Sequence, residues 1–371
     1  MKKHIILFLF FISFSVKSQT EKIEKEITIN SVEYIEDIKI DHNNFYVAGF
    51  TFKVSKPDGY STNSLLGKYD KNLKLLWNLK LNLTSKSEIN KLEVYDNKIY
   101  ALVKHGKNSN TTTETYMNLY VISMNGKIIE KIKIGNCYSN PTNILIEKNK
   151  LWFAYPESSS KYYSTSNIIK TILVEYDLKT KKVIKKKGNT SSCFPQKIIS
   201  KNSDIYIFGR FEKVIGDLVS EHFVLKFEKN LAIEVILHTE KSEYFLDAYQ
   251  SDEEFVILTT FPGVYGDLNK FIKYSYFNIK NKIIKEKIIY FKDNKWTDIK
   301  FETYNEVDTT WLIIKHNNSK EYYTQLNKKG EVISEISLEK IGNNINKFII
   351  QKDYQIQNAG NQIKLTNELR N

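Results

Sequence analysis

A short aromatic and β-branched run recurs along the chain at nearly constant spacing. The first copy is FYVAGF at residues 45–50, and later copies begin at Ile99, Leu151, Ile205, Phe255, Trp311 and, more weakly, Gln362. Successive copies start 50 to 56 residues apart. In a sequence without helical periodicity, a period near fifty residues is typical of a repeat that folds as one four-stranded sheet. The spacing therefore predicts an all-β fold, a β-propeller of four-stranded antiparallel blades.

The amino-acid composition also favours β-strands. The 371 residues include 24 Tyr and 21 Phe, which favour pleated, half-buried surfaces. Length alone would suggest two domains, but neighbouring repeats share one continuous core. We therefore expect residues 19–371 to form a single propeller domain.

The number of blades depends on the two ends of the chain. Each repeat reads as four strands, which in the first repeat are residues 34–40, 45–52, 64–69 and 73–81. Six full repeats occupy residues 32–340. The remaining candidate strands, 22–29 at one end and 347–354 and 362–369 at the other, together predict a seventh blade that leaves no open sheet edge. Six blades with an extra terminal hairpin is the alternative.

The N-terminus resembles a secretory signal. Lys2 and Lys3 precede an apolar segment at residues 5–16, and the small residue Ser18 favours cleavage before Gln19. The apolar segment is shorter than the roughly 20 residues of a spanning helix, although a retained anchor is the alternative. Residues 1–18 are thus predicted to be a signal peptide. The mature chain is expected in the periplasm, at the cell surface or in the medium, with no integral membrane span.

The formal charge is +12, but its distribution does not indicate a nucleic-acid partner. Lysines occur in every repeat and mostly alternate with apolar residues, as expected for the solvated face of outer strands. The densest run, residues 179–187, falls at a predicted hairpin. A solvated turn that protects a sheet edge is the simpler interpretation, and contact with a polyanion or envelope surface is the alternative.

The two ends of the predicted ring differ in their connections. The joints between first and second strands and between third and fourth strands are short and polar, so we call that end the tight-turn face. The other joints are long, including residues 53–63, 106–116 and 156–167. Binding residues concentrate on loops held by a rigid scaffold, so the opposite end, the long-loop face, is the candidate site.

Aromatic residues are frequent on the long-loop face. Exposed aromatic rings suit glycan or peptide binding because they give large contact area at low entropic cost, whereas packing between blades is the alternative. The candidate binding residues are Tyr60, Tyr138, Tyr162, Tyr163, Phe194, Tyr265 and Trp296, with Tyr244 nearby.

The two cysteines, Cys137 and Cys193, lie one repeat apart in the same phase. Adjacent blades would place both at the start of an inner strand. In an exported chain this favours a Cys137–Cys193 disulfide, and two buried free thiols are the alternative.

Motifs for catalysis, metals or cofactors are missing from the sequence. The histidines fall in different repeats without ligand spacing, and the sequence contains no HExxH, GxSxG, P-loop or dinucleotide motif. We therefore predict no metal and no cofactor. For an enzyme, the candidate acids at the channel mouth are Asp58, Asp247, Asp267 and Asp298.

A partial family resemblance supports the architecture. Residues 69–77 (YDKNLKLLW) resemble the repeat motif of bacterial secreted propellers of the PQQ-like and related types, and residues 124–126 and 176–177 match it in part. Only the first repeat keeps the tryptophan, so the resemblance does not imply a quinone cofactor and fixes no active residue.

The sequence thus favours an exported, non-catalytic module that recognises a protein, peptide or glycan through the long-loop face. Two alternatives remain. One is a propeller hydrolase or lyase with carboxylates at the channel mouth, and the other is a structural component of a cell-envelope complex. Oligomeric state is not indicated.

Overall fold

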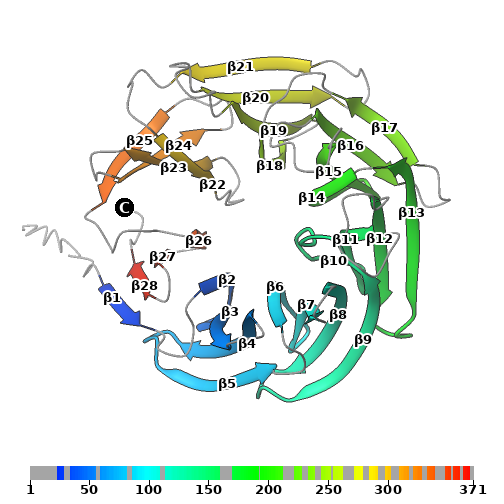
Figure 1. Ribbon diagram of the computed structural model, residues 1–371. Coiled ribbons are helices and arrows are strands. Elements are labelled where there is room, and N and C mark those ends of the chain that lie inside the picture. Colours follow the sequence, from blue (N-terminus) through cyan, green and yellow to red (C-terminus); the bar gives the residue numbers. More distant parts are fainter. Residues whose placement is uncertain are drawn as a thin grey trace, which may run out of the picture.

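The computed structural model is all-β over the residues that it describes. These are residues 23–28, 34–55, 59–81, 86–108, 113–158, 169–191, 193–211, 221–227, 233–238, 244–251, 254–261, 271–278, 284–290, 297–301, 309–316, 321–327, 332–338, 347–351, 354–359 and 362–367. The predicted signal segment lies outside them. Figure 1 shows the sheets arranged around a central opening, with the strands of each sheet following one another from the opening to the periphery.

The first eight strands after β1 form two antiparallel four-stranded units. The first unit contains β2 (Tyr34–Asp41), β3 (Asn44–Ser55), β4 (Gly59–Asp70) and β5 (Leu75–Leu81). The second contains β6 (Lys86–Tyr95), β7 (Lys98–Asn108), β8 (Thr113–Ser123) and β9 (Ile128–Asn136). A single parallel pair, Thr62 with Lys86, joins them into one eight-stranded sheet.

The next two units repeat the same meander. The third contains β10 (Leu145–Glu147), β11 (Lys150–Ser158), β12 (Ile169–Asp177) and β13 (Val183–Ser191). The fourth contains β14 (Cys193–Lys201), β15 (Asp204–Phe211), β16 (Glu221–Phe227) and β17 (Ile233–His238).

Two further sheets continue the series. The fifth unit contains β18 (Tyr244–Ser251), β19 (Glu254–Phe261), β20 (Phe271–Asn278) and β21 (Ile284–Tyr290). The sixth contains β22 (Thr297–Phe301), β23 (Thr309–His316), β24 (Glu321–Asn327) and β25 (Val332–Leu338).

The last sheet combines both ends of the chain. Its order is β1 (Ile23–Thr28), β28 (Gln362–Asn367), β27 (Tyr354–Ala359) and β26 (Lys347–Gln351). The pairing of β1 with β28 is antiparallel, from Ile23 opposite Asn367 to Thr28 opposite Gln362. The expectation that terminal strands share a sheet is therefore confirmed, whereas the single strand predicted at residues 347–354 is divided between β26 and β27.

Turn chemistry explains why the recurrent joints are tight. Two-residue turns such as Asp96-Asn97, Lys148-Asn149 and Asn202-Ser203 have positive φ at both positions, as type I′ hairpins require. In the joint between β4 and β5, the Asp70 carboxylate accepts hydrogen bonds from the backbone N–H groups of Asn72 and Lys74. The polar residues that predicted these joints therefore have a direct structural role.

Two of the predicted long loops are mostly strand. Residues 53–55 of β3 pair with residues 59–61 of β4, and β7 and β8 continue their pairing to Asn108 and Thr113. The predicted loops at 53–63 and 106–116 were therefore wrong over most of their length. The polar residues of these segments, such as Ser55, Ser61 and Asn108, obscured the strand signal.

Cores lie between successive units. Phe45, Val47 and Leu65 pack within one buried cluster, whereas Tyr46, Ala48 and Leu66 pack with residues of β6 and β7 in the next. This alternation follows the two-residue period of a strand, which directs neighbouring side chains to opposite faces. Trp77 contributes to the contact between units, because its Nε1 donates to the Met124 carbonyl at 2.8 Å.

Candidate functional site

The strands next to the central opening carry a recurrent irregularity near their first residues. Register shifts occur at Ile35/Asp37 in β2, Ile89/Lys91 in β6, Pro195/Lys197 in β14 and Phe245/Asp247 in β18. Such bulges turn a side chain away from the regular alternation. The residue after each bulge lies four residues before the last residue of its inner strand, so these residues occupy one equivalent position. Asn143 occupies the same position in the third unit, four residues before Glu147.

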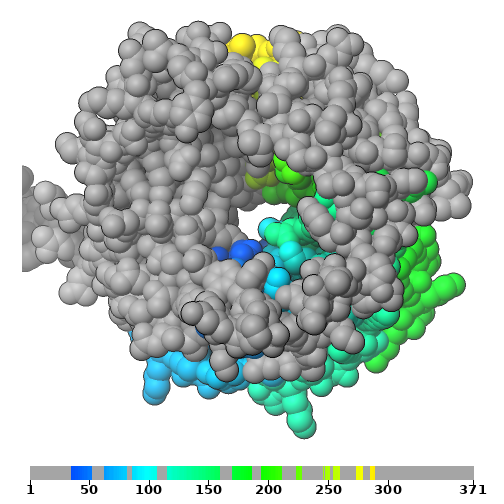
Figure 2. All heavy atoms as spheres, in the orientation of Figure 1, coloured from blue at the N-terminus to red at the C-terminus, as the bar shows by residue number. Residues whose placement is uncertain are grey.

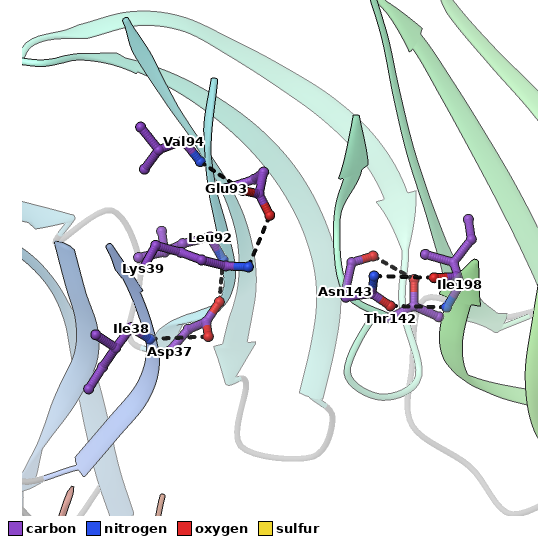
Figure 3. A network of polar contacts seen from close by, with 9 residues as sticks. All are labelled: Asp37, Ile38, Lys39, Leu92, Glu93, Val94, Thr142, Asn143 and Ile198. Carbon is purple, nitrogen blue, oxygen red and sulfur yellow. Dashed lines mark hydrogen bonds and ion pairs between the residues drawn. The ribbon is translucent and has the colours of Figure 1, made fainter. Parts of the chain in front are cut away.

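Side chains at this equivalent position link one unit to the next. Asp37 accepts hydrogen bonds from its neighbour Ile38 N–H at 3.1 Å and from Leu92 N–H of the next unit at 2.7 Å. Asn143 accepts from Ile198 N–H at 3.0 Å and donates to the Ile198 carbonyl at 3.2 Å. Figure 3 shows both groups, Asp37 directed toward Leu92 and Asn143 toward Ile198.

Charged pairs extend the same set of contacts. Lys197 Nζ lies 3.0 Å from an Asp247 oxygen, and Ala248 N–H donates to Asp247. Lys39 Nζ pairs with Glu93 at 2.9 Å (Figure 3). Burial disfavours the Lys39 ammonium, but the Glu93 and Asp37 carboxylates outweigh this effect and raise the pKa of Lys39. The candidate acid Asp247 is thus engaged in holding adjacent units together.

A polar group lies where the second and third units meet near the start of their inner strands. Glu88 and Lys104 form an ion pair at 3.1 Å, and the Lys104 ammonium also donates to Asn140 Oδ1 at 3.2 Å. Asn90 donates to the same Asn140 oxygen at 3.3 Å. Asn140 is exposed and Glu88 and Lys104 are half-buried, so this part of the group borders solvent at the long-loop end, whereas Asn90 is buried. We call Glu88, Asn90, Lys104, Tyr138 and Asn140 the mouth cluster.

Tyr138 extends the mouth cluster toward the fourth unit. Its N–H donates to the Pro156 carbonyl at 2.8 Å, which anchors the backbone beside β11. Its ring meets that of Phe194 edge to face, with centroids 5.7 Å apart, and the Arg210 guanidinium lies over the Phe194 ring at 5.6 Å. Gly209 permits this approach, because a Cβ there would lie 2.2 Å from the Phe194 carbonyl oxygen.

The structure brings together two of the predicted aromatic residues and distinguishes their roles. Phe194 is 4% exposed and packs beneath the surface, whereas Tyr138 is half-buried and keeps an accessible part. Tyr60 lies in β4 and Tyr244 begins β18, but their side chains are not described. Tyr162, Tyr163, Tyr265 and Trp296 lie outside the described residues.

The cysteine positions match the predicted phase, but the bond is not shown. Cys137 forms an isolated bridge with Glu157 ahead of β10, and Cys193 begins β14 in the following unit. Cys137 is a buried free thiol, and burial raises its pKa to about 12. A thiol with this pKa is a poor nucleophile at neutral pH. The predicted disulfide is therefore not formed in this structure, in which Cys137 is enclosed in the core between the second and third units.

Two buried titratable side chains, His105 and Tyr155, have strongly shifted pKa values. Burial lowers the pKa of His105 to about 4, with a smaller contribution from Lys131, so the imidazole is neutral at pH 7. Burial also raises the pKa of Tyr155 above its ordinary value. Of the other candidate acids, Asp298 lies in β22 without a described side chain, and Asp58 and Asp267 lie outside the described residues. Within the described part, no three His, Cys, Asp or Glu residues group to hold a metal.

Sequence inspection missed the polar part of the mouth cluster. Glu88, Lys104 and Asn140 are ordinary surface residue types, and they come from three separate segments. The sequence contained one usable signal. When the repeats are aligned on their tight turns, Asn90 lies one residue before Lys91, which occupies the equivalent position in the second unit.

Comparisons with known proteins identify the fold alone. No protein-family model matches the chain, and no curated protein matches it either. Among solved structures, a PL25-family ulvan lyase, a polysaccharide lyase, has a TM-score of 0.55 at 12% identity and covers 78% of this chain and 77% of its own. Drosophila Semaphorin 2a has a TM-score of 0.53 at 10% identity, covering 92% and 75%. The fold is thus of the β-propeller type.

A further group of matches is weaker. A Synechocystis apocarotenoid oxygenase has a TM-score of 0.43 at 9% identity, and the chain spans 58% of the length of that protein. A score this low supports no structural argument. In the described part of the chain, no helix has the length and apolarity needed to cross a membrane.

Proposed function

We propose that this chain is an exported, seven-bladed β-propeller that binds a glycan, peptide or protein at its long-loop face. The four-stranded units are the blades, and β1 completes the last blade and closes the ring. The N-terminal signal pattern supports export. The binding surface includes the mouth cluster, and the ring encloses the central opening visible in Figure 2.

The composition of the mouth cluster carries the proposal. An aromatic ring with one accessible part, an exposed amide and a charged pair lie together at the boundary between two blades. Aromatic faces and planar polar groups are the usual means of contacting sugar rings and their hydroxyls. Among the three ligand classes, the described residues therefore favour a glycan.

Four of the described acids and tyrosines are poor candidates for a catalytic base. A lyase requires a base to abstract a proton, with a pKa near the working pH. Asp37 and Asp247 accept backbone hydrogen bonds, and the shifted tyrosines Tyr155 and Tyr120 have raised pKa values. An enzyme active site would therefore have to be assembled from other residues.

A glycan screen with product detection tests the proposal. The mature chain, residues 19–371, is applied to an array of neutral and acidic polysaccharides, and the supernatant is assayed for new reducing ends and unsaturated products. We expect retention of a glycan that stays intact. Tyr138→Ala should weaken that retention by about tenfold, a typical loss for a binding aromatic residue. Tyr95→Ala, which removes an exposed tyrosine at the tight-turn face, is the matched control.

Two results would contradict the proposal. Release of shortened or unsaturated products would assign the chain to the lyase or hydrolase class. Equal loss of binding for Tyr138→Ala and Tyr95→Ala would show that the mouth cluster is not the binding site. Binding to peptides alone would keep the site but exclude the glycan.

A further inference from the structure

The tight-turn face of the first three units is strongly basic. Within the described residues between 62 and 185, eleven lysines are exposed, whereas Asp96 is the single acidic residue in that class. The sequence as a whole has 55 basic and 43 acidic residues, so the imbalance is much greater among the exposed residues of the first three units. Six of the exposed lysines flank the turns that lead into β5, β9 and β13. They are Lys71, Lys74, Lys127, Lys179, Lys181 and Lys182.

The acidic residues of these turns have other bonding partners. Asp70 and Asp177 use their carboxylates to accept backbone N–H groups within the turns, at 2.7 to 3.0 Å. Glu130 is bonded to the Tyr176 hydroxyl at 3.2 Å and to Lys181 at 3.3 Å. These three carboxylates keep their charge, but they stand beside six lysines, of which Lys181 is ion-paired with Glu130, so the turns carry a net positive charge.

Exposed aliphatic side chains accompany these lysines. Leu75 and Leu76 in β5 are 44% and 49% exposed, and Ile128 and Ile129 in β9 are 42% and 51% exposed. Both strands bulge immediately after the turn, because Leu76 is skipped in the pairing of β5 with β4 and Ile129 is skipped in the pairing of β9 with β8. Because of each bulge, two consecutive residues face solvent, whereas regular alternation would direct one of them toward the sheet. Ile184 is exposed at the corresponding place in β13.

The three turns belong to one continuous surface. Trp77 of β5 donates to the Met124 carbonyl beside the turn before β9, and a Cβ at Gly126 would lie 2.9 Å from the Trp77 ring. Lys181, in the turn before β13, pairs with Glu130 of β9. In Figure 1 the strands β5, β9 and β13 follow one another along the periphery, and their described residues lie at the lower and right margins of Figure 2.

We propose that this surface, formed by the six lysines with Leu75, Leu76, Ile128, Ile129 and Ile184, docks on an anionic lipid surface. Lysines attract acidic headgroups, and the adjoining aliphatic side chains enter the boundary between headgroups and acyl chains. Protection of sheet edges explains lysines but not aliphatic pairs, which increase the risk of aggregation at an edge. An acidic polysaccharide would satisfy the lysines and leave the aliphatic residues without a partner.

Docking at this end would direct the long-loop face away from the lipid. The mouth cluster lies at the opposite end of the inner strands from the tight turns. A protein held in this way could bind a soluble ligand and the lipid at the same time. The docking inference does not depend on the identity of that ligand.

Vesicle sedimentation tests the proposal with residues 19–371. The chain is mixed with phosphatidylcholine vesicles with and without phosphatidylglycerol, and the bound fraction is measured at low and high salt. We expect binding only to the anionic vesicles, weakened by salt. Each lysine near such a surface contributes about a fivefold factor, so the triple variant Lys127→Gln, Lys179→Gln, Lys182→Gln should lose at least about tenfold in affinity.

Two matched variants separate this surface from general charge and from glycan binding. Lys80→Gln with Lys133→Gln removes exposed lysines from the far ends of β5 and β9 and should change binding little, since screening limits charge effects to about 8 Å at physiological salt. Leu76→Ser with Ile129→Ser should weaken vesicle binding without changing retention on a sulfated polysaccharide column.

Three outcomes would overturn the proposal. They are no binding to anionic vesicles, equal losses for the turn and far-end lysine variants, or full vesicle binding by the Leu76→Ser, Ile129→Ser variant. Retention on the polysaccharide column without vesicle binding would identify an acidic glycan as the occupant. Circular dichroism of each variant establishes that it is folded.

Discussion

Asp37 offers the most direct test of how adjacent units are held together. Asp37 is 7% exposed, and its carboxylate accepts hydrogen bonds from Ile38 N–H and Leu92 N–H. Replacing it with alanine removes both bonds and leaves the Leu92 N–H, at the boundary between units, without this acceptor. Lys39, whose pKa the Asp37 carboxylate helps to raise, also loses a favourable charge.

The magnitude follows from the bonds lost. A hydrogen bond to a charged group contributes about 1.5–3 kcal/mol, and a buried unsatisfied donor costs about 1–3 kcal/mol. Because these effects overlap, we expect Asp37→Ala to lower the free energy of unfolding by about 3 kcal/mol. Asp37→Asn keeps one acceptor oxygen but directs an NH₂ group toward the other donor, so a loss of about 1–2 kcal/mol is expected.

Urea denaturation followed by circular dichroism and tryptophan fluorescence measures both values. The control is Asp96→Asn, which removes an exposed carboxylate that lies 4.0 Å from Lys98 and should change stability by less than about 0.5 kcal/mol. A change in Asp37→Ala no larger than that of the control would refute the argument that this carboxylate couples the first two units.

Two further predictions concern His105 and the terminal strands. Because the pKa of His105 is lowered to about 4 in the folded protein, from about 6.5 when unfolded, the unfolded state binds more protons between these values. Stability should therefore fall by about 1–2 kcal/mol as the pH drops from 7 to 5, and His105→Gln, which does not titrate, should flatten this part of the pH profile. An identical pH profile for the variant would exclude His105 as the cause. Starting the chain at residue 31 removes β1 and its pairing with β28, so its melting temperature should fall by several degrees relative to residues 19–371. Equal melting temperatures would mean that β1 does not stabilise the fold.

The sequence predicted most of the strand pattern because the relevant signals are local. In the first unit, the predicted strands at residues 34–40 and 73–81 nearly coincide with β2 and β5. Polar turns such as Asp70–Asn72 and Asn125-Gly126 lie where they were expected. The pairing of the two terminal strands also followed from counting the strands left over at each end.

The contacts between units could not be predicted in the same way. Asp37 and Leu92 are 55 residues apart, and the equivalent linking position is occupied by Asp37, Lys91, Asn143, Lys197 and Asp247. Residue type is not constant at this position because each side chain has a different partner. The bulge that orients these side chains also leaves no compositional signal. The polar mouth cluster was missed for the same reason, whereas Tyr138 and Phe194 were found because aromatic residues are conspicuous.

The pairing of β1 with β28 has a consequence for how the protein is made. The two strands are separated by more than three hundred residues, so the last six-residue strand must leave the ribosome before the first one gains its partner. Until then the N-terminal strand is an unpaired edge that is open to pairing with other chains. Loop-closure entropy increases only slowly with length, so bringing the two ends together costs about 5 kcal/mol, a modest penalty for so large a separation. A nascent chain that stalls before residue 362 would therefore leave β1 open to aggregation and proteolysis.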